Sequence, residues 1–230
     1  MKIRPATVAA GLAALLIFAG FVALGVWQIH RRAWKLALIE QVDARAHATP
    51  VAPPGPGVAV TAANDAYRRV IVRGVFLNGR ETFVRAATAL GSGYWVVTPL
   101  RTADGVVLIN RGYVSPEQRT VHAKPAGEQT VTGYLRISEP GGGFLRSNDP
   151  AHDRWYSRDV AAIAQARSVR AAPYFIDADR VGDAAPVGGL TVIAFPNNHL
   201  VYMLTWFGLA GLTLVGFGIF VRQDRRRTVG

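Results

Sequence analysis

The stretch Thr7–Ile29, TVAAGLAALLIFAGFVALGVWQI, sets the fold class of this 230-residue chain. It carries no charged side chain. About 20 apolar residues, at a rise of 1.5 Å each, cross the roughly 30 Å hydrocarbon core of a bilayer. A second stretch of the same kind, Leu200–Val221, lies near the other end of the chain. We therefore expect two transmembrane helices, one towards each end.

The first apolar stretch is typical of an uncleaved membrane anchor. It is longer than the roughly 7–15 apolar residues of a signal peptide, and no A-x-A-like cleavage site follows it before Trp27. Apolar residues recur at helical spacing as far as Val42, and the segment 49–57, rich in Pro and Gly, is typical of a linker. We expect one helix over Thr7–Ala46, of which 7–29 lies in the membrane.

Basic residues around the two apolar stretches predict the orientation of the chain. By the positive-inside rule, the arginines after the second stretch should stay in the cytoplasm: Arg222, Arg225, Arg226 and Arg227. Two spans place both termini on the same side of the membrane, and Lys2 and Arg4 also favour the cytoplasm for the N-terminus. The basic residues at 31–35 favour the opposite orientation, but long loops cross the membrane largely regardless of their charge. Since no Arg- and Ser-rich presequence precedes the anchor, we expect a multi-pass protein of the bacterial inner membrane with both termini cytoplasmic.

The composition limits the partners and the chemistry of the chain. The net charge of +11 follows from the basic flanks and scattered surface arginines, so anionic membrane lipid is an expected partner. Nucleic acid is not expected, because the stretch between the spans would lie outside the cytoplasm. The absence of cysteine excludes disulfides, thiol redox chemistry and thiolate metal sites.

Residues 47–198 should form one periplasmic β-rich domain, long enough to have its own core. Runs of β-branched or alternating residues predict strands at 69–76, 81–86, 94–100, 106–110, 129–137, 174–177 and 191–195. Asn78-Gly79 is a hairpin-type turn, which predicts a hairpin between the first two of these strands. One helix, 158–167, interrupts the series.

The whole chain is thus predicted to be a membrane protein of α+β class. Two transmembrane helices, 7–29 and 199–221, flank a mainly antiparallel sandwich or barrel with one inserted helix. A basic cytoplasmic tail over 222–230 follows the second helix.

The expected β domain contains no motif of a catalytic site. His122 and His152 lie in loop-like sequence without a nucleophile elbow such as G-x-S-x-G, and we expect both to be exposed. No H-E-x-x-H pair is present, and Met1 and Met203 do not form the cluster that a copper chaperone needs. In the run NRGY over 110–113, Arg111 either binds a carboxylate ligand or holds a strand–turn junction.

The strongest candidate for chemistry is the polar cluster PNNHLVYMLTW over 196–206, at the start of the second apolar stretch. At 100° per residue, His199, Tyr202 and Trp206 share one helix face. The glycines at 208, 211 and 218 lie on roughly the opposite side, where another helix could approach closely. The end of the first span carries a similar set on one side of its helix: Trp27, His30, Arg31 and Trp34.

A histidine at the membrane edge has two interpretations. If the spans are antiparallel neighbours, His30 and His199 lie at similar depth, and either imidazole could be an axial ligand of haem iron. Arg31 could then pair with a haem propionate. The alternative is an interfacial belt, in which Trp, Tyr, His and Arg are common without binding a ligand.

Several short motifs, in this order and with the two terminal spans, resemble the Surf1 family of cytochrome c oxidase assembly factors, found in bacterial and mitochondrial inner membranes. The resemblance covers nearly the whole chain, although Met203 stands where the family pattern has Ala. It rests on GVWQIHR over 25–31, YRRV over 67–70, GVF over 74–76, GYWVVTPL over 93–100, INRGYV over 109–114, VTGYLR over 131–136 and PNNHLVYMLTWF over 196–207.

The resemblance implies a non-enzymatic role in maturing a haem–copper oxidase, with haem a bound and handed to the catalytic subunit I. The histidine of the family's Asn-Asn-His motif falls on His199, which is the implied ligand of the haem iron. Haem a synthase is a further expected partner. The expected cofactor-binding residues are His199, Tyr202, Trp206, Trp27, His30 and Arg31.

Two other functions stay open at this point. The protein could be a haem-independent scaffold whose β domain holds partly built oxidase, with the membrane-edge residues serving only as an anchor. A periplasmic hydrolase is the third interpretation, but the sequence shows no nucleophile–base pair for it.

Overall fold

The computed structural model describes residues 5–143 and 145–229. The chain divides into a helical unit, Met1–Gln41 with Ala194–Gly230, and a β unit, Val42–Ile193. Lys2 and Arg4, used above for the orientation, lie outside the described residues.

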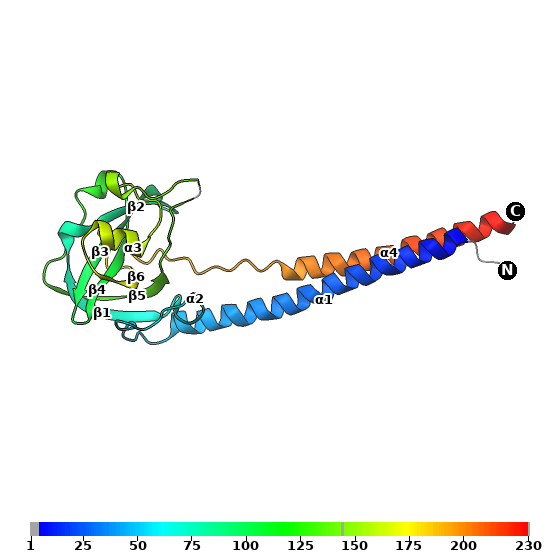
Figure 1. The fold of residues 1–230 in the computed structure, drawn as a ribbon, viewed down its shortest axis with the longest axis horizontal. Helices are drawn as coiled ribbons and strands as arrows, with labels where there is room; N and C mark the ends of the chain where they lie inside the picture. The colour runs from blue at the N-terminus through cyan, green and yellow to red at the C-terminus, as the bar shows by residue number, and fades with distance from the viewer. Residues whose placement is uncertain (1–4, 144, 230) are drawn as a thin grey trace. The chain divides into compact units, whose positions relative to one another are not determined.

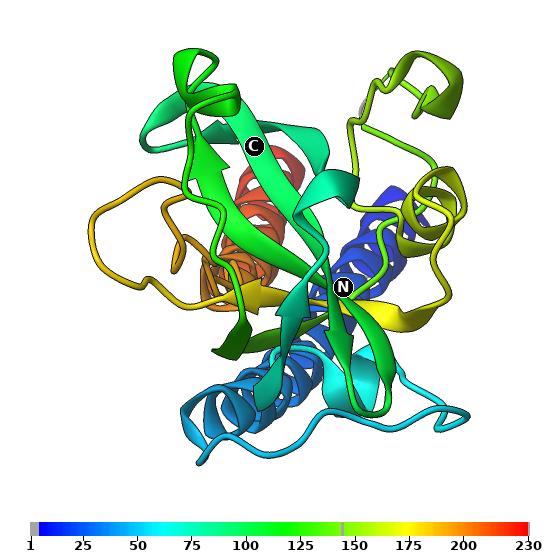
Figure 2. The same ribbon diagram turned by 90° about the vertical axis from the view of Figure 1, so that its left-hand side faces the viewer.

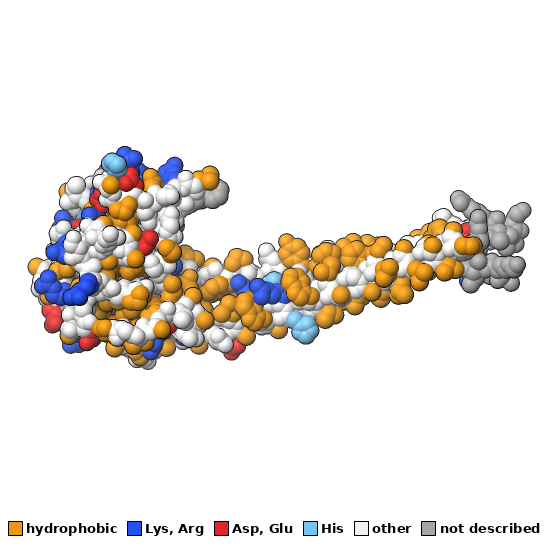
Figure 3. Space-filling view, viewed as in Figure 1, with side chains coloured by type: hydrophobic (Ala, Val, Ile, Leu, Met, Phe, Trp, Pro, Cys, Tyr) orange, Lys and Arg blue, Asp and Glu red, His pale blue; other side chains and the backbone are white. Residues whose placement is uncertain are grey.

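The helical unit consists of two long helices that run side by side (Figure 1), α1 over Pro5–His47 and α4 over His199–Val229. Helix α1 confirms the single helix predicted over Thr7–Ala46. Both helices are long and apolar enough to cross a membrane. Apolar side chains cover most of the helical surface seen in Figure 3. Helix α4 continues past 221 as far as Val229, so the predicted basic tail begins as helix.

The two helices face each other through residues spaced alternately three and four apart, as in a coiled coil. On α4 these residues are at least partly shielded, while their immediate neighbours other than Leu209 are exposed: His199, Met203, Trp206, Ala210, Thr213 and Phe217. The matching set on α1 is Gly11, Ala14, Phe18, Phe21, Gly25 and Gln28. Thr7 closes the far end by donating to the Asp224 carboxylate at 2.7 Å.

The expectation that the glycines of α4 form its packing face is wrong. Nothing lies within 4 Å of a Cβ placed at Gly208, Gly211 or Gly218. The close approach comes from glycines of α1 instead, because they make room for the aromatic rings of α4. A Cβ at Gly25 would lie 2.7 Å from the Phe207 ring.

We expect Gly25→Ile to destabilise the helix pair by roughly 1–3 kcal/mol, because the added side chain would overlap the Phe207 ring. The midpoint of thermal unfolding of the detergent-solubilised chain, followed by tryptophan fluorescence, measures the effect. Gly208→Ile is the matched control, since its Cβ meets open space, and it should leave the midpoint unchanged. Equal loss in the two variants would contradict the packing described here.

The β unit is built around a sheet that closes into a small barrel (Figure 2). The sheet order is β1-β5-β6-β4-β3-β2, and a further pairing between β1 and β3 closes the ring and leaves β2 at an edge. The pairing of β4 with β6 is parallel, and the other paired strands that the structure describes are antiparallel. The strands are β1 Arg69–Phe76, β2 Thr82–Thr88, β3 Gly91–Thr102, β4 Gly105–Val114, β5 Glu128–Ile137 and β6 Ala171–Ala178.

Short helices connect these strands. The inserted helix predicted over 158–167 is α3, Val160–Ala166, which begins where the Asp159 carboxylate accepts from the Ala162 N–H at 3.1 Å. The others are α2 Ala62–Asp65 and the one-turn 3₁₀ helices η1 Asn78–Arg80, η2 Glu117–Arg119 and η3 Pro150–His152.

Two features of the predicted β domain are wrong. Asn78-Gly79 does not join a hairpin, because β1 pairs with β5 and β3 while Asn78 begins η1. The expected strand 191–195 is irregular. Strand β6 already has β4 on one side and β5 on the other, so it offers no free edge to a further strand there.

The buried residues form two clusters that lie on opposite faces of β6. Tyr174 and Ile176 belong to the cluster inside the barrel, with Val70, Leu100 and Leu135. Phe175 points to the other side, into a cluster with Trp155 of the 146–157 loop and Ile163 of α3. This alternation follows from the two-residue period of a strand, and it places α3 and the loop over the outer face of the sheet.

Candidate functional site

His199, the first residue of α4, is held by Gln28 of α1. Its Nδ1 lies 2.7 Å from the Gln28 Oε1, and Gln28 is only 7% exposed. An amide oxygen only accepts, so Nδ1 carries the hydrogen of this bond. In the unprotonated ring the lone pair then belongs to Nε2, for which the described chain supplies no hydrogen-bond partner. The pair therefore fixes both the ring orientation and the tautomer of His199.

Trp206 lies two turns further along the same face of α4. Its ring stacks on Phe21 of α1, with centroids 5.8 Å apart and an interplanar angle of 26°. The indole N–H is buried and has no acceptor in the described chain. Trp206 and His199 thus both lie against α1, whereas the sequence predicted that they would face away from the neighbouring helix.

The other predicted site residues do not converge on His199. Tyr202 and Trp27 are more than half exposed. His30 is exposed and lies two residues, or about 200°, from Gln28 around α1, so it is on the side away from α4. Arg31 places its guanidinium 4.1 Å from the Trp34 ring centroid. The structure therefore does not bring His30 and His199 together as a pair.

Gln28 is the residue that the sequence reasoning missed. A signal for it exists, because Gln28 is the one amide, hydroxyl or charged side chain between Val8 and Ile29. A polar group in such a run needs a hydrogen-bond partner on a neighbouring helix. His199 is that partner, and it lies 171 residues away in the chain.

In the β domain, His122 is buried rather than exposed, contrary to the prediction. Its Nε2 lies 3.1 Å from the Glu81 Oε2, and the Arg111 Nη1 lies 3.0 Å from the Glu81 Oε1. Burial lowers the pKa of the Arg111 guanidinium. Arg111 therefore ties η1 and β2 to β4 through an internal carboxylate. His152 is exposed as expected and pairs with Asp149 at 2.8 Å.

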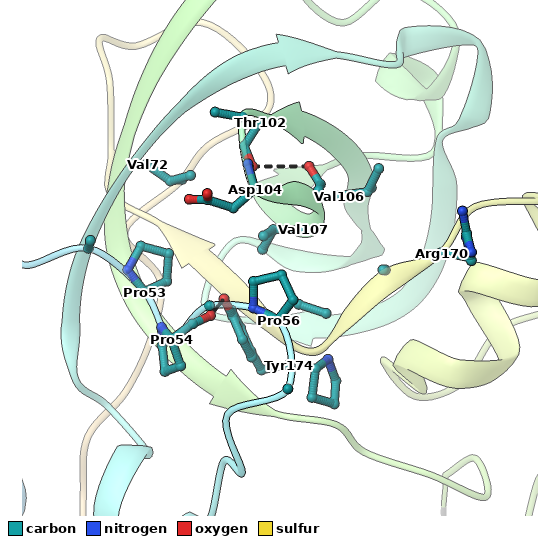
Figure 4. A pocket seen from close by; sticks show the side chains of 18 of the residues that line it. Pro53, Pro54, Pro56, Val72, Thr102, Asp104, Val106, Val107, Arg170 and Tyr174 are labelled. Atoms are coloured by element: carbon teal, nitrogen blue, oxygen red, sulfur yellow. Dashed lines mark hydrogen bonds between the residues drawn. The ribbon is translucent and has the colours of Figure 1, made fainter.

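A hollow of about 830 Å³ in the β domain lies beneath the Pro-rich linker (Figure 4). Tyr174 points into it from β6 and donates its hydroxyl to the Pro54 carbonyl at 2.7 Å. Burial raises the pKa of Tyr174 to about 12. The tyrosine thus anchors the linker to the barrel. Among the described residues, no three His, Cys, Asp or Glu side chains converge to hold a metal ion.

These features define a membrane protein of α+β class, which has two long apolar helices, a small β-barrel, and a fixed histidine where the second helix begins. The SURF1 family model matches residues 15–211, and the chain belongs to this family. Family membership implies a role in cytochrome c oxidase assembly, and the family is generally non-catalytic.

The relatives cover most of the chain. Surfeit locus protein 1 of Mus musculus is 36% identical over 234 residues, which span 91% of this chain and 75% of the relative. The protein of the same name from Homo sapiens is 36% identical over 215 residues, 83% of this chain and 70% of the relative. That of Takifugu rubripes is 33% identical, with 91% of this chain and 96% of the relative covered.

Proposed function

We propose that this chain binds haem a through the Nε2 of His199 and presents it to the catalytic subunit I during oxidase assembly. The observation that carries the proposal is the hydrogen bond from His199 to Gln28. Histidines that ligate a metal usually donate their other ring N–H to an acceptor, which orients the ring and raises its basicity. Gln28 is placed to do this for His199.

The residues present fit a haem that is bound transiently as cargo, rather than one held as a permanent cofactor. At this end of the helix pair, His199 is the imidazole that a described side chain orients, while His30 lies on the other side of α1. The exposed rings of Tyr202 and Trp27 add apolar surface at this end of the helix pair. A single axial bond from His199, together with apolar contacts, suits a haem that must be released to a partner. The cargo haem would supply an iron with an open position for that bond.

We also infer that the protein lies in a bacterial inner membrane, with both termini in the cytoplasm and the β domain in the periplasm. The arginines that follow the second span support this orientation by the positive-inside rule. Haem a synthase, as the source of haem, and anionic lipid are the further partners that we propose.

The test is the absorption spectrum of the full chain purified from cells that make haem a. We expect a Soret band that His199→Ala abolishes. Gln28→Leu keeps the size of the side chain but removes the acceptor, and it should weaken haem binding by about 10- to 100-fold.

His30→Ala is the matched control. This exposed histidine lies only two residues from Gln28 on α1, and its replacement should leave the Soret band unchanged. Circular dichroism of each variant separates lost binding from lost fold. A Soret band that persists in folded His199→Ala would refute ligation by His199.

A haem-independent scaffold is the alternative function. The buried salt bridges and barrel of the β domain give it a rigid surface that could hold partly built oxidase. Replacing both apolar helices with unrelated spans distinguishes the two functions, since retained oxidase maturation would favour the scaffold.

A further inference from the structure

Three arginines converge on a hollow of about 460 Å³ on the outer face of the β domain. Arg85 comes from β2, Arg119 from η2 and Arg154 from the loop after η3. The rings of Phe83 and Tyr94 also line the hollow. Its volume lies in the range of about 300–1,000 Å³ that is typical of ligand sites.

Aromatic rings, not carboxylates, hold two of these guanidinium groups. Arg119 lies 4.8 Å from the Phe83 ring centroid and 5.0 Å from that of Tyr94. Arg85 lies 5.3 Å from the Tyr94 ring centroid. Stacking on a ring leaves the N–H edges of a guanidinium free to bind a carboxylate with two parallel hydrogen bonds.

None of the three arginines forms a salt bridge in the part of the chain that the structure describes. This distinguishes them from the protein's more buried arginines, which bond to carboxylates: Arg69, Arg111, Arg136 and Arg158.

The carboxylates near the hollow already have partners. Asp153 pairs with Arg167, and Asp149 accepts from His152 at 2.8 Å. The three guanidinium groups, with Arg167, outnumber these two carboxylates, so the positive charge around the hollow is only partly compensated. An anion bound between the arginines would reduce their mutual repulsion.

We propose that this hollow binds an acidic polypeptide segment, a stretch of a partner protein with at least two carboxylate side chains. The guanidinium edges would take the carboxylates, and the Phe83 and Tyr94 rings would take the apolar parts of the segment. This proposal does not depend on haem binding, because every residue involved lies within the β domain.

The edge strand beside the hollow favours a polypeptide over a small anion. Strand β2 is at the edge of the sheet, and the Arg85 N–H points outward to the Trp155 carbonyl at 2.9 Å. By the two-residue period of a strand, the Ala87 N–H and C=O point the same way. No other backbone group in the described chain bonds to them. An extended segment could pair with this edge while its side chains enter the hollow.

The experiment titrates the full chain, in uncharged detergent, with a fluorescein-labelled hexaglutamate peptide and follows fluorescence anisotropy. The triple variant Arg85→Gln, Arg119→Gln and Arg154→Gln should bind at least 10-fold more weakly. The matched control removes the same charge from exposed arginines elsewhere on the β domain, Arg73→Gln, Arg101→Gln and Arg170→Gln, and should bind as the parent does.

The other arms of the titration separate alternative ligands. A hexaglutamine peptide should not bind, and neither inorganic phosphate nor vesicles containing anionic lipid should displace the hexaglutamate at equal anion concentration. If the first triple variant does not fold, the single Arg154→Gln, at an exposed position, should still weaken binding measurably. Equal loss in the two triple variants, or displacement by phosphate or by lipid, would overturn the proposal.

Discussion

Replacing Asp177 with alanine is expected to destabilise the β domain by about 3–5 kcal/mol, a large part of the roughly 5–15 kcal/mol by which a domain is normally stable. The Asp177 side chain is 4% exposed and forms salt bridges with Arg136 and Arg158. It also accepts from the Asn110 Nδ2 at 2.7 Å and from the Thr191 hydroxyl at 3.0 Å. Without the carboxylate, two arginines stay buried with their main counter-charge gone.

The free energy of unfolding from urea titration, followed by circular dichroism of the β signal, measures this loss. Asp183→Ala is the control, because the Asp183 side chain is 93% exposed and pairs with the exposed Arg180. It should leave the unfolding midpoint unchanged. A loss below 1 kcal/mol in Asp177→Ala would mean that Glu139, which also contacts Arg136 and Arg158, compensates fully.

Gly112→Ala is the second change for which we expect a large effect, a loss of several kcal/mol in the stability of the β domain. Gly112 has a φ of +124°, a backbone conformation that disfavours any side chain. A Cβ there would also lie 2.2 Å from the Val187 carbonyl oxygen. That oxygen accepts from the Tyr113 N–H at 2.9 Å, so the chain at Val187 cannot retreat without losing the bond.

Gly105→Ala separates the effect of backbone strain from that of steric overlap. Gly105 has a similar φ of +132°, but a Cβ added there would meet open space. Thermal unfolding should show a moderate fall in midpoint for Gly105→Ala and a clearly larger one for Gly112→Ala. Equal falls would show that backbone strain alone accounts for the Gly112 effect.

Much of the architecture follows from local pattern. An uncharged run such as Thr7–Ile29 has one stable form in a bilayer, because a helix satisfies every backbone group within itself. The expected strands up to 174–177 are present because alternation of apolar residues is a local property. The continuation of the first helix past Ile29 is predictable too, because it follows from the spacing of apolar residues along the chain. The family could likewise be predicted, since its motifs are short and contiguous.

Strand pairing and side-chain partners could not be predicted in this way. Asn78-Gly79 has the local chemistry of a hairpin, yet the pairing of β1 with β5 decides the sheet. His122 lies in a loop, but Glu81, 41 residues away, makes its burial favourable. A buried polar group is tolerated only with a partner, and that partner is set by the fold.

By itself, the sequence determined the two membrane-length helices and most strands, and it made His199 a candidate ligand, because length, periodicity and motif are properties of contiguous residues. Only the tertiary structure decided what His199 contacts. The glycines of α1, not those of α4, admit the facing rings, and this packing turns His199 towards Gln28. The physical reason is that a helix face is selected by how well both surfaces fit, which neither helix encodes alone.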